Sequence, residues 1–332
     1  MKKSPAQLSA TTSLVPKEEG AQIEFLPQTP AGRDRTPNAA LAYLATLHSE
    51  TSRIAMRSKL NVVARLAGYA DLTLCPWEAM APEHVIAMLE TLERQGRRAN
   101  TVNCYLAAIK GVAKAAWLVG SLSHEVMLRI SAIKQRRTKR LPAGRSLTPS
   151  ESRALLADCD TRNDAIGRRD KAILSLMLGC GLRRGEIPDL RWENYDQNEG
   201  ALTLIGKGDK ERRVFLPEEV ESYLLAWIKK DRGENYGLLF GRIYKNGRID
   251  LTRPMDARSI GDILASHRIV EGRSAYTAHD LRRTFATRLL EDNVDIVTVQ
   301  GMMGHASVTT TARYDRRGND KYRRAANNIK LT

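Results

Sequence analysis

The sequence predicts a mainly α-helical protein of two domains, with a small antiparallel β-sheet in the second. Three observations support this fold class. Apolar residues recur three and four positions apart in the first third of the chain and again in the second half, a spacing typical of amphipathic helices. A strongly basic stretch, residues 134–146, separates these two regions. Behind it, the β-like segments ALTLI and RRVFLP flank the glycine-containing turn GKGDKE, as in a hairpin.

Residues 1–36 are expected to form a mobile tail, because they are rich in Ser, Thr, Pro, Ala and Gln and lack periodicity. Residues 37–133 are expected to form a small all-helical domain. Its segments with helical spacing are LAYLATL, VVARLAGYA, HVIAMLETLERQG and TVNCYLAAIKGVAKAAWLVG, and Pro37, Pro76 and Pro82 punctuate them. This domain shows no residue pattern typical of catalysis.

The linker, residues 134–146, reads KQRRTKRLPAGRS. Six of its 13 residues are basic and none is acidic. A solvated linker is the plain interpretation, but a segment of this charge is also attracted to a phosphate backbone. The candidate DNA contacts here are Arg136, Arg137, Lys139 and Arg140. We expect this linker to be the hinge of a clamp.

Residues 147–332 are expected to form the second domain, mainly helical with one small sheet. The segment LTPSESRALL resembles a capped helix start, with Thr148 or Ser150 as the N-cap, Pro149 in the first turn and Glu151 close behind. Further helices are expected at RRDKAILSLMLGCG, EEVESYLLAWIKK, DARSIGDILASHRIV, AHDLRRTFATRLLED and VDIVTVQGMM.

The charge balance points to a polyanionic partner. The chain has 53 Lys and Arg against 38 Asp and Glu, a formal net charge of +15, and its pI is about 9.8. A pI this high is the usual electrostatic signature of a nucleic-acid-binding protein. Aromatic residues make up only 5% of the chain, which disfavours base stacking and favours contact with the backbone of duplex DNA.

The hydrophobic pattern and the cysteines indicate the cellular compartment in which the protein works. No apolar run reaches the roughly 18 residues of a membrane span, and the start, MKKSPAQLSATTSLVPKEEG, is a poor signal peptide, so no membrane partner is expected. The cysteines, Cys75, Cys104, Cys159 and Cys180, show no C-x-x-C pairing and no histidines at zinc-ligand spacing. They are interpreted as free thiols in a reducing compartment.

Six residues of the second domain are candidates for chemistry: Arg183, Lys207, His279, Arg282, His305 and Tyr314. His279 and Arg282 are three apart in a helical pattern, so they share one face. Arg183 follows a helix interrupted by glycines, and Lys207 lies at the expected hairpin tip. Each of these residues alone is more often an ordinary surface or core residue, and only their combination indicates a function.

In combination these positions resemble the tyrosine recombinase (phage integrase) family, in family order from about Thr148 to the end of the chain. The family's G-L-R-x-x-E box is matched by Gly181, Leu182, Arg183 and Glu186, its hairpin lysine by Lys207, and its H-x-L-R box by His279, Leu281 and Arg282. Its L-G-H box is matched in part by Gly304 and His305, with Met303 in place of the leucine, and its tyrosine nine residues later by Tyr314. The sequence departs from the family pattern at two positions: Met303 replaces the leucine of the L-G-H box, and Pro188 is unusual after GEI.

The resemblance implies a role for each matched residue. Tyr314 is expected to be the nucleophile and His279 its general base. Arg183 and Arg282 are expected to bind the non-bridging oxygens of the scissile phosphate, and His305 to donate a hydrogen bond to it. Lys207 is the expected general acid for the 5′-oxygen. Glu186 is expected to orient Arg183 or to cap local structure.

The implied activity is site-specific recombination of duplex DNA through a 3′-phosphotyrosine and a Holliday junction. Because the phosphotyrosine conserves the phosphodiester bond energy, no cofactor and no metal are expected, and the sequence has no G-x-x-x-x-G-K-[ST] loop. The first domain resembles the family's core-binding domain, which with the catalytic domain makes a C-shaped clamp around DNA. A homo-tetramer on two DNA sites is implied, with the tail after Tyr314 packing on a neighbouring protomer.

The resemblance further implies a bacterial or phage-derived protein of the cytoplasm, associated with the nucleoid, and leaves room for an accessory DNA-binding protein. Three alternatives stay open on the sequence. A type IB topoisomerase uses the same chemistry, and a non-catalytic DNA-binding regulator needs the charge but not the six matched positions. A metal-dependent nuclease needs acidic or histidine clusters, which the sequence does not show.

Overall fold

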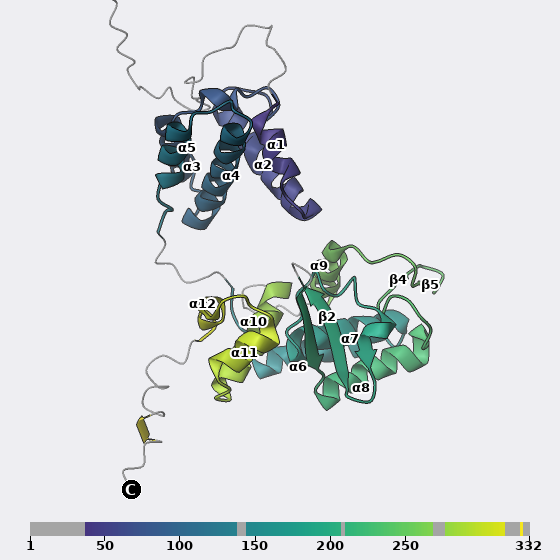
Figure 1. Cartoon of the computed structure of the whole chain (residues 1–332). Coiled ribbons are helices and arrows are strands. Elements are labelled where there is room, and N and C mark those ends of the chain that lie inside the picture. The colour runs from purple at the N-terminus through teal and green to yellow at the C-terminus, as the bar shows by residue number, and fades with distance from the viewer. Residues whose placement is uncertain (1–36, 138–143, 207–209, 268–275, 316–325, 328–332) are drawn as a thin grey trace, which may run out of the picture. The chain divides into compact units, whose positions relative to one another are not determined.

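The chain divides into two compact units, Met1–Arg140 and Leu141–Thr332. The computed structural model describes residues 37–137, 144–206, 210–267, 276–315 and 326–327 (Figure 1). The expectations for residues 1–36 and for most of the tail after Tyr314 therefore lie outside the described residues. Among the helices that are described, none is both long enough and apolar enough to cross a membrane.

The described part of the first unit is helical, and it appears purple to blue in Figure 1. Its elements are α1 (Ala39–Ala45), α2 (Glu50–Leu66), a 3-10 turn (Trp77–Ala79), α3 (Pro82–Arg94), α4 (Ala99–Leu118) and α5 (His124–Ala132). The Asn38 side chain accepts hydrogen bonds from two backbone amides of α1 and so caps its start. The long α4 contacts each of the other helices, and its alanine-rich face is buried in the core of this unit.

The start of the linker is attached to the first unit. Arg136 donates its backbone amide to Asn103 Oδ1 (2.7 Å) and receives a hydrogen bond from Asn103 Nδ2 at its carbonyl (2.9 Å). Its Nε lies 2.7 Å from Glu93 Oε1 in an ion pair. Part of the positive charge expected to be free for DNA is therefore already paired with a carboxylate, whereas Arg137 is exposed.

The second unit is helical around a small sheet, as the sequence predicts. Its helices are α6 (Pro149–Asp160), α7 (Ala165–Gly179), α8 (Glu218–Trp227), α9 (Ala257–Ser266), α10 (Ala278–Glu291), α11 (Ile296–Met303) and α12 (Val308–Ala312), with a 3-10 turn (Trp192–Asn194) and a π-helical turn (Ile228–Arg232). Its strands are β1 (Tyr195–Asp196), β2 (Ala201–Gly206), β3 (Lys210–Phe215), β4 (Arg242–Ile243) and β5 (Ile249–Asp250). The expected fold class, mainly α with a small antiparallel sheet, is confirmed.

The sheet is antiparallel in the order β1-β2-β3, and the expected hairpin is its β2-β3 pair. A second antiparallel pair, β4-β5, was not predicted, and neither was the short helix α12. Strands of two residues carry too short an alternation to be recognised in a sequence. Of the two candidate caps for α6, Thr148 is the N-cap, and it forms a capping box with Glu151.

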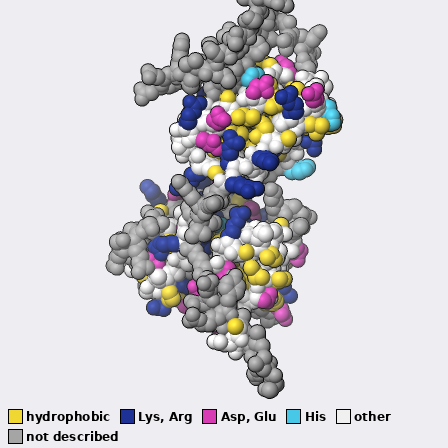
Figure 2. Space-filling model, turned by 90° about the vertical axis from the view of Figure 1, so that its left-hand side faces the viewer, with side chains coloured by type: hydrophobic (Ala, Val, Ile, Leu, Met, Phe, Trp, Pro, Cys, Tyr) yellow, Lys and Arg dark blue, Asp and Glu magenta, His cyan; other side chains and the backbone are white. Residues whose placement is uncertain are grey.

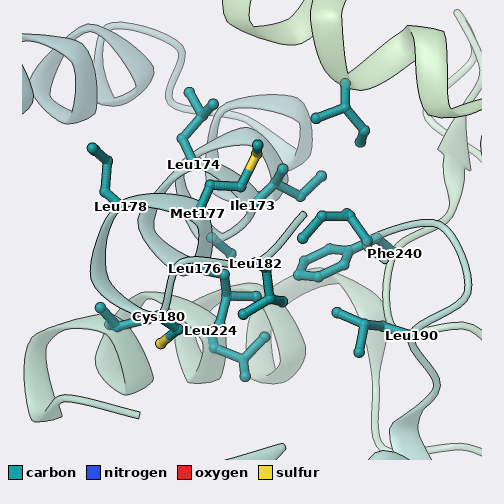
Figure 3. Packing of buried hydrophobic residues seen from close by; sticks show 14 of the residues in the cluster. Ile173, Leu174, Leu176, Met177, Leu178, Cys180, Leu182, Leu190, Leu224 and Phe240 are labelled. Atoms are coloured by element: carbon teal, nitrogen blue, oxygen red, sulfur yellow. The ribbon is translucent and has the colours of Figure 1, made fainter. Parts of the chain in front are cut away.

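The main core of the second unit surrounds α7, which contacts α6, α8 and α10. Figure 3 shows how side chains from α7 meet those of α8 and of the loops that follow. The labelled residues are Ile173, Leu174, Leu176, Met177, Leu178, Cys180, Leu182, Leu190, Leu224 and Phe240. Burial of this apolar surface fixes the end of α7, from which Arg183 follows four residues later.

A smaller, separate core lies between α10, α11 and α12. It contains Phe285, Ala286, Leu290, Val299, Met303 and Tyr314. The end of the linker also lies on α10, because Leu147 donates its backbone amide to Thr284 Oγ1 (2.8 Å) and Arg145 donates its own to Asp280 Oδ1 (3.1 Å). Helix α10 is therefore buried along most of its length, polar side chains included.

A buried ion-pair network joins α6 and α7 to the end of α9. His267 Nδ1 lies 2.9 Å from Asp158 Oδ2, and His267 Nε2 lies 3.1 Å from Asp170 Oδ2. Hydrogen bonding to Asp170 raises the pKa of His267 above its ordinary value. Arg169 pairs with the other oxygen of Asp170 at 2.7 Å. Charged groups this deeply buried are expected only as partners of one another.

Candidate active site

Arg183 lies in the turn that leaves α7. The turn depends on Gly181, whose φ of 64° is in the left-handed region that favours glycine. A Cβ atom at this position would lie 2.3 Å from Phe285 Cδ1, so the close approach of α10 also requires glycine. Gly181 is one of the glycines that singled out Arg183 in the sequence. Its lack of a side chain allows the end of α7 and α10 to pack closely.

Glu186 joins two arginines. It accepts hydrogen bonds from the backbone amide and Nη1 of Arg183, both at 2.7 Å, and from both terminal nitrogens of Arg212, both at 2.8 Å. Burial alone would raise the pKa of this carboxyl, but the hydrogen bonds from Arg212 and from the Arg183 amide outweigh burial and lower the pKa to about 2. Glu186 therefore orients Arg183, as the sequence interpretation expected.

Arg282 reaches the same place from α10. Its Nη1 donates to the carbonyl of Gly181 and its Nη2 to the carbonyl of Met303. Arg183 Nη2 donates to the carbonyl of Gly304 at 2.7 Å. Burial, together with the nearby Arg183, lowers the pKa of Arg282 to about 10, so the guanidinium is still charged at neutral pH. Two cationic groups thus converge on the end of α11.

The end of α11 is shaped for this convergence. Gly304 caps the helix in the left-handed conformation, with φ of 58°. A Cβ atom on Gly304 would lie 2.9 Å from Arg212 Cδ. Strand β3, which carries Arg212, contacts α11. His305, which follows Gly304, therefore lies beside Arg183, Arg212 and Arg282.

His305 follows directly and lies against Tyr314. The two rings are stacked, with centroids 5.9 Å apart and planes at 25°. His305 Nδ1 lies 2.9 Å from the hydroxyl of Thr311. Burial and the charges of Arg282 and Arg183 lower the pKa of His305 to about 4, so its imidazole is neutral at pH 7.

The Tyr314 hydroxyl faces His279, which lies in the first turn of α10. The distance from the hydroxyl oxygen to His279 Nε2 is 3.3 Å. Burial, with a contribution from Arg283, lowers the pKa of His279 below its ordinary value, so this ring is also largely neutral and can accept a proton. The Arg283 guanidinium lies 5.4 Å from the centre of the Tyr314 ring. Tyr314 itself is 5% exposed.

The structure thus brings together Arg183, His279, Arg282, His305 and Tyr314. Lys207 lies outside the described residues, as do Lys139 and Arg140 of the linker; the register of the hairpin is described up to the pair Gly206–Lys210. In the described ranges, no group of three or more His, Cys, Asp or Glu side chains is placed to hold a metal ion. Chemically, the arrangement offers a tyrosine hydroxyl, a neutral imidazole to deprotonate it, and two guanidinium groups suited to an anion.

Sequence reasoning missed Arg212, Arg283 and Thr311. In Lys210–Phe215 either of two adjacent arginines could have faced inward. The register pairs Arg212 with the buried Leu204, which shows that Arg212 shares the inner face with Val214. The period of two along the strand was a usable signal. Thr311 had no such signal among three consecutive threonines.

The comparisons with known proteins decide the family. The model of the phage integrase family matches residues 145–320, more than half of the chain. The chain belongs to the phage integrase family. A tyrosine recombinase XerD of Listeria monocytogenes serotype 4b (strain F2365) is 30% identical over 234 residues, which cover 69% of this chain and 76% of the relative. A tyrosine recombinase XerC of Alcanivorax borkumensis is 28% identical over 72% of this chain and 76% of its own length.

Solved structures of integrases share the fold. The Tn1549 transposon integrase in complex with a circular intermediate DNA superposes with a TM-score of 0.63 at 17% identity, covering 87% of this chain and 98% of that one. A lambda integrase tetramer bound to a Holliday junction gives a TM-score of 0.62 at 18% identity, covering 84% and 76%. The expected resemblance to the tyrosine recombinases is confirmed, and so is the expectation of an enzyme of site-specific DNA recombination. The relatives favour neither the topoisomerase nor the regulator.

Proposed function

We propose that this phage integrase family member cuts and rejoins duplex DNA at specific sites, with Tyr314 as the nucleophile of a 3′-phosphotyrosine intermediate. The observation that carries the proposal is the position of the Tyr314 hydroxyl. It lies 3.3 Å from a neutral His279 Nε2, and its ring stacks on His305 beside the paired Arg183 and Arg282. A hydrogen-bonded base next to a nucleophile and an anion-binding pair is the constellation that phosphoryl transfer requires.

The proposed reaction breaks one phosphodiester bond and forms one phosphotyrosine bond. The Tyr314 oxygen attacks the scissile phosphorus, and its proton passes to His279 Nε2. The bond from phosphorus to the 5′-oxygen breaks, and the leaving oxygen takes a proton from Lys207. Rejoining reverses these transfers, with a 5′-hydroxyl of the partner strand as the nucleophile. No bond energy is lost, so the exchange needs no external energy source.

The arginines supply the electrostatic part. The Arg183 side chain is 39% exposed and can bind a non-bridging oxygen directly. Arg282 is 3% exposed, but each of its terminal nitrogens has a second N–H in addition to the one donated to a carbonyl. Donors held in place before the phosphate arrives stabilise the developing charge without further reorganisation.

The partners follow from the charge and from the relatives. Lys and Arg side chains are spread over the visible faces of both units (Figure 2), and the net charge is +15. The lambda integrase of similar fold is a tetramer bound to a Holliday junction, which supports the proposal of four protomers on two DNA sites here. We also propose that the first unit is the core-binding domain of a DNA clamp and that an accessory protein sets the direction of recombination. The proposed contacts to the DNA backbone are Arg136, Arg137, Lys139 and Arg140. The bacterial relatives support the proposed cytoplasmic location, and the proposed association with the nucleoid rests on the proposed DNA binding.

The test is a nicked suicide substrate that traps the covalent intermediate. Tyr314→Phe should bind DNA but form no covalent adduct, because Phe keeps the ring and lacks the attacking oxygen. Tyr236→Phe is the matched control, since Tyr236 is 84% exposed and should cleave like wild type. An adduct formed by Tyr314→Phe would remove Tyr314 from the role of nucleophile.

The role of Lys207 has its own test. Lys207→Ala should slow cleavage severely at an ordinary 5′-oxygen and much less at a 5′-bridging phosphorothiolate, because sulfur leaves without protonation. Equal defects on both substrates would remove Lys207 from the acid role. Cleavage should also persist in excess EDTA, since the residues proposed here need no metal.

Recombination itself requires two sites. Two copies of the cognate site on one plasmid should give deletion or inversion according to their relative orientation, with Holliday-junction intermediates when later steps are slowed. Catalytic relaxation of plasmids without a site, and no joining of sites, would instead support the topoisomerase.

A further inference from the structure

Thr311 contacts His305, although the proposed chemistry assigns Thr311 no role. It lies on α12, one turn before Tyr314, and is completely buried. Its Oγ1 is 2.9 Å from His305 Nδ1, and its carbonyl accepts the Tyr314 backbone amide at 2.9 Å. A single buried residue therefore touches both the proposed nucleophile and the histidine stacked on it.

We propose that Thr311 is a positioning residue that holds His305 in the tautomer protonated at Nε2, so that His305 presents an N–H, and not a lone pair, to the scissile phosphate. This inference rests on the proposed function, in which His305 donates to that phosphate. It assigns the direction of the hydrogen bond between Thr311 and His305, which the positions of the heavy atoms alone leave open.

The direction follows from the burial of the hydroxyl. Among the described residues, His305 Nδ1 is the hydrogen-bond partner of Thr311 Oγ1. If Nδ1 carried the proton and donated it, the hydroxyl proton would be buried without an acceptor. Buried polar groups are nearly always satisfied, so the hydroxyl donates and Nδ1 accepts. The single proton of a neutral imidazole is then on Nε2.

The charges around His305 make the tautomer important. Arg282, Arg183, His279 and Arg212 all disfavour a second proton on this ring, and burial acts in the same direction. With one proton on the ring, the choice of nitrogen decides whether Nε2 donates to an anion or repels it. In water the two tautomers of imidazole exchange freely, and a fixed partner at one nitrogen selects between them.

The backbone of His305 is also fixed. Its amide donates to the Gln300 carbonyl at 3.1 Å, and its carbonyl accepts from Gln300 Nε2 at 2.9 Å. The contacts of the backbone with α11, of Nδ1 with α12 and of the ring with Tyr314 together restrict the directions in which Nε2 can point. Thr311 therefore sets both the protonation and the orientation of the donor.

Two variants distinguish the effect of the Thr311 hydroxyl from the effect of the side-chain shape. Thr311→Val keeps the branched shape and removes the hydroxyl, whereas Thr311→Ser keeps the hydroxyl. Thr310→Val is the matched control, because it makes the same change one residue earlier in α12.

Thermal unfolding of each variant checks that the fold is kept. In single-turnover cleavage of the nicked substrate, Thr311→Val should be slower by about 10- to 100-fold, by analogy with metal-bound histidines that lose the partner of their other nitrogen. Thr311→Ser should keep most of the wild-type rate and Thr310→Val all of it.

Two readouts would not respond to a merely structural role. The first is NMR of protein labelled with 15N in its six histidines, with the His305 signals identified by their loss in His305→Gln. Wild type should show His305 protonated at Nε2, and Thr311→Val should show a mixture of tautomers. The second is a double mutant: the cleavage defect of Thr311→Val should disappear in a His305→Gln background, because both changes remove the same donor.

An unchanged tautomer in Thr311→Val, or an equal defect in the His305→Gln background, would overturn the proposal and make Thr311 a packing residue. Unchanged cleavage by His305→Gln would instead contradict the role of His305 in the proposed function. The NMR result does not depend on that role, so the two failures are distinguishable.

Discussion

Replacing Glu186 by Gln should destabilise the second unit and displace Arg183. The carboxylate accepts hydrogen bonds from the backbone amide and Nη1 of Arg183 and from both terminal nitrogens of Arg212, at 2.7 to 2.8 Å. Its side chain is 10% exposed. Gln keeps the shape, but it replaces one acceptor oxygen by a donor and removes the negative charge between two guanidinium groups. One guanidinium is then left without its buried counter-charge.

The magnitude follows from the pKa of Glu186, which is lowered from 4.5 to about 2. At about 1.4 kcal/mol per pH unit, this difference corresponds to about 3 kcal/mol. Removing one partner of a buried ion pair costs about 3–5 kcal/mol in other proteins, which agrees in size. Because the folded-state pKa lies below the unfolded one, the stabilisation is present above about pH 4.5 and is lost as the pH falls toward 2.

Urea unfolding at pH 7, followed by circular dichroism, measures the effect. We expect Glu186→Gln to lower the free energy of unfolding of the second unit by about 3 kcal/mol. Asp160→Asn is the matched control, since Asp160 pairs with Lys171 at 2.6 Å but is 61% exposed, and its effect should stay below about 1 kcal/mol. Single-turnover cleavage should also be slower in Glu186→Gln, but not in Asp160→Asn. Equal effects of the two variants on stability would refute the reasoning, as would a difference between wild type and Glu186→Gln that persists at pH 2.

Three further predictions concern the turn, the base and a buried histidine. Gly181→Ala should unfold more easily than wild type and cleave more slowly, because its Cβ would lie 2.3 Å from Phe285 Cδ1; Gly185→Ala, which meets nothing within 4 Å, should behave as wild type in both assays. The cleavage rate should rise with pH and reach its plateau before pH 6.5, because burial lowers the pKa of His279 below that value. His279→Gln should remove this rise. Hydrogen bonding to an aspartate raises the pKa of His267, so wild type should lose stability as the pH rises through that raised pKa, and urea unfolding of His267→Gln should lack this dependence.

Much of the candidate site could be predicted from local sequence. The capping box of Thr148 and Glu151 was recognisable because it involves residues three apart. His279 and Arg282 lie on one helix, as their spacing indicates. The hairpin of β2 and β3 was also predicted from its two β-like segments and the turn between them. The catalytic roles of these residues stay predictions until the variants are measured.

The sequence by itself therefore determined the helices, the hairpin, the basic charge and the residue types of the site, because each depends on side chains a few positions apart. Only the tertiary structure decided which distant groups meet. Arg183 reaches the Gly304 carbonyl across 121 positions and Arg282 reaches the Gly181 carbonyl across 101. Such contacts depend on how the apolar faces of α7, α10 and α11 fill their shared cores, and no local spacing encodes that fit. The inward register of Arg212 and the contact of Thr311 with His305 follow from the same packing.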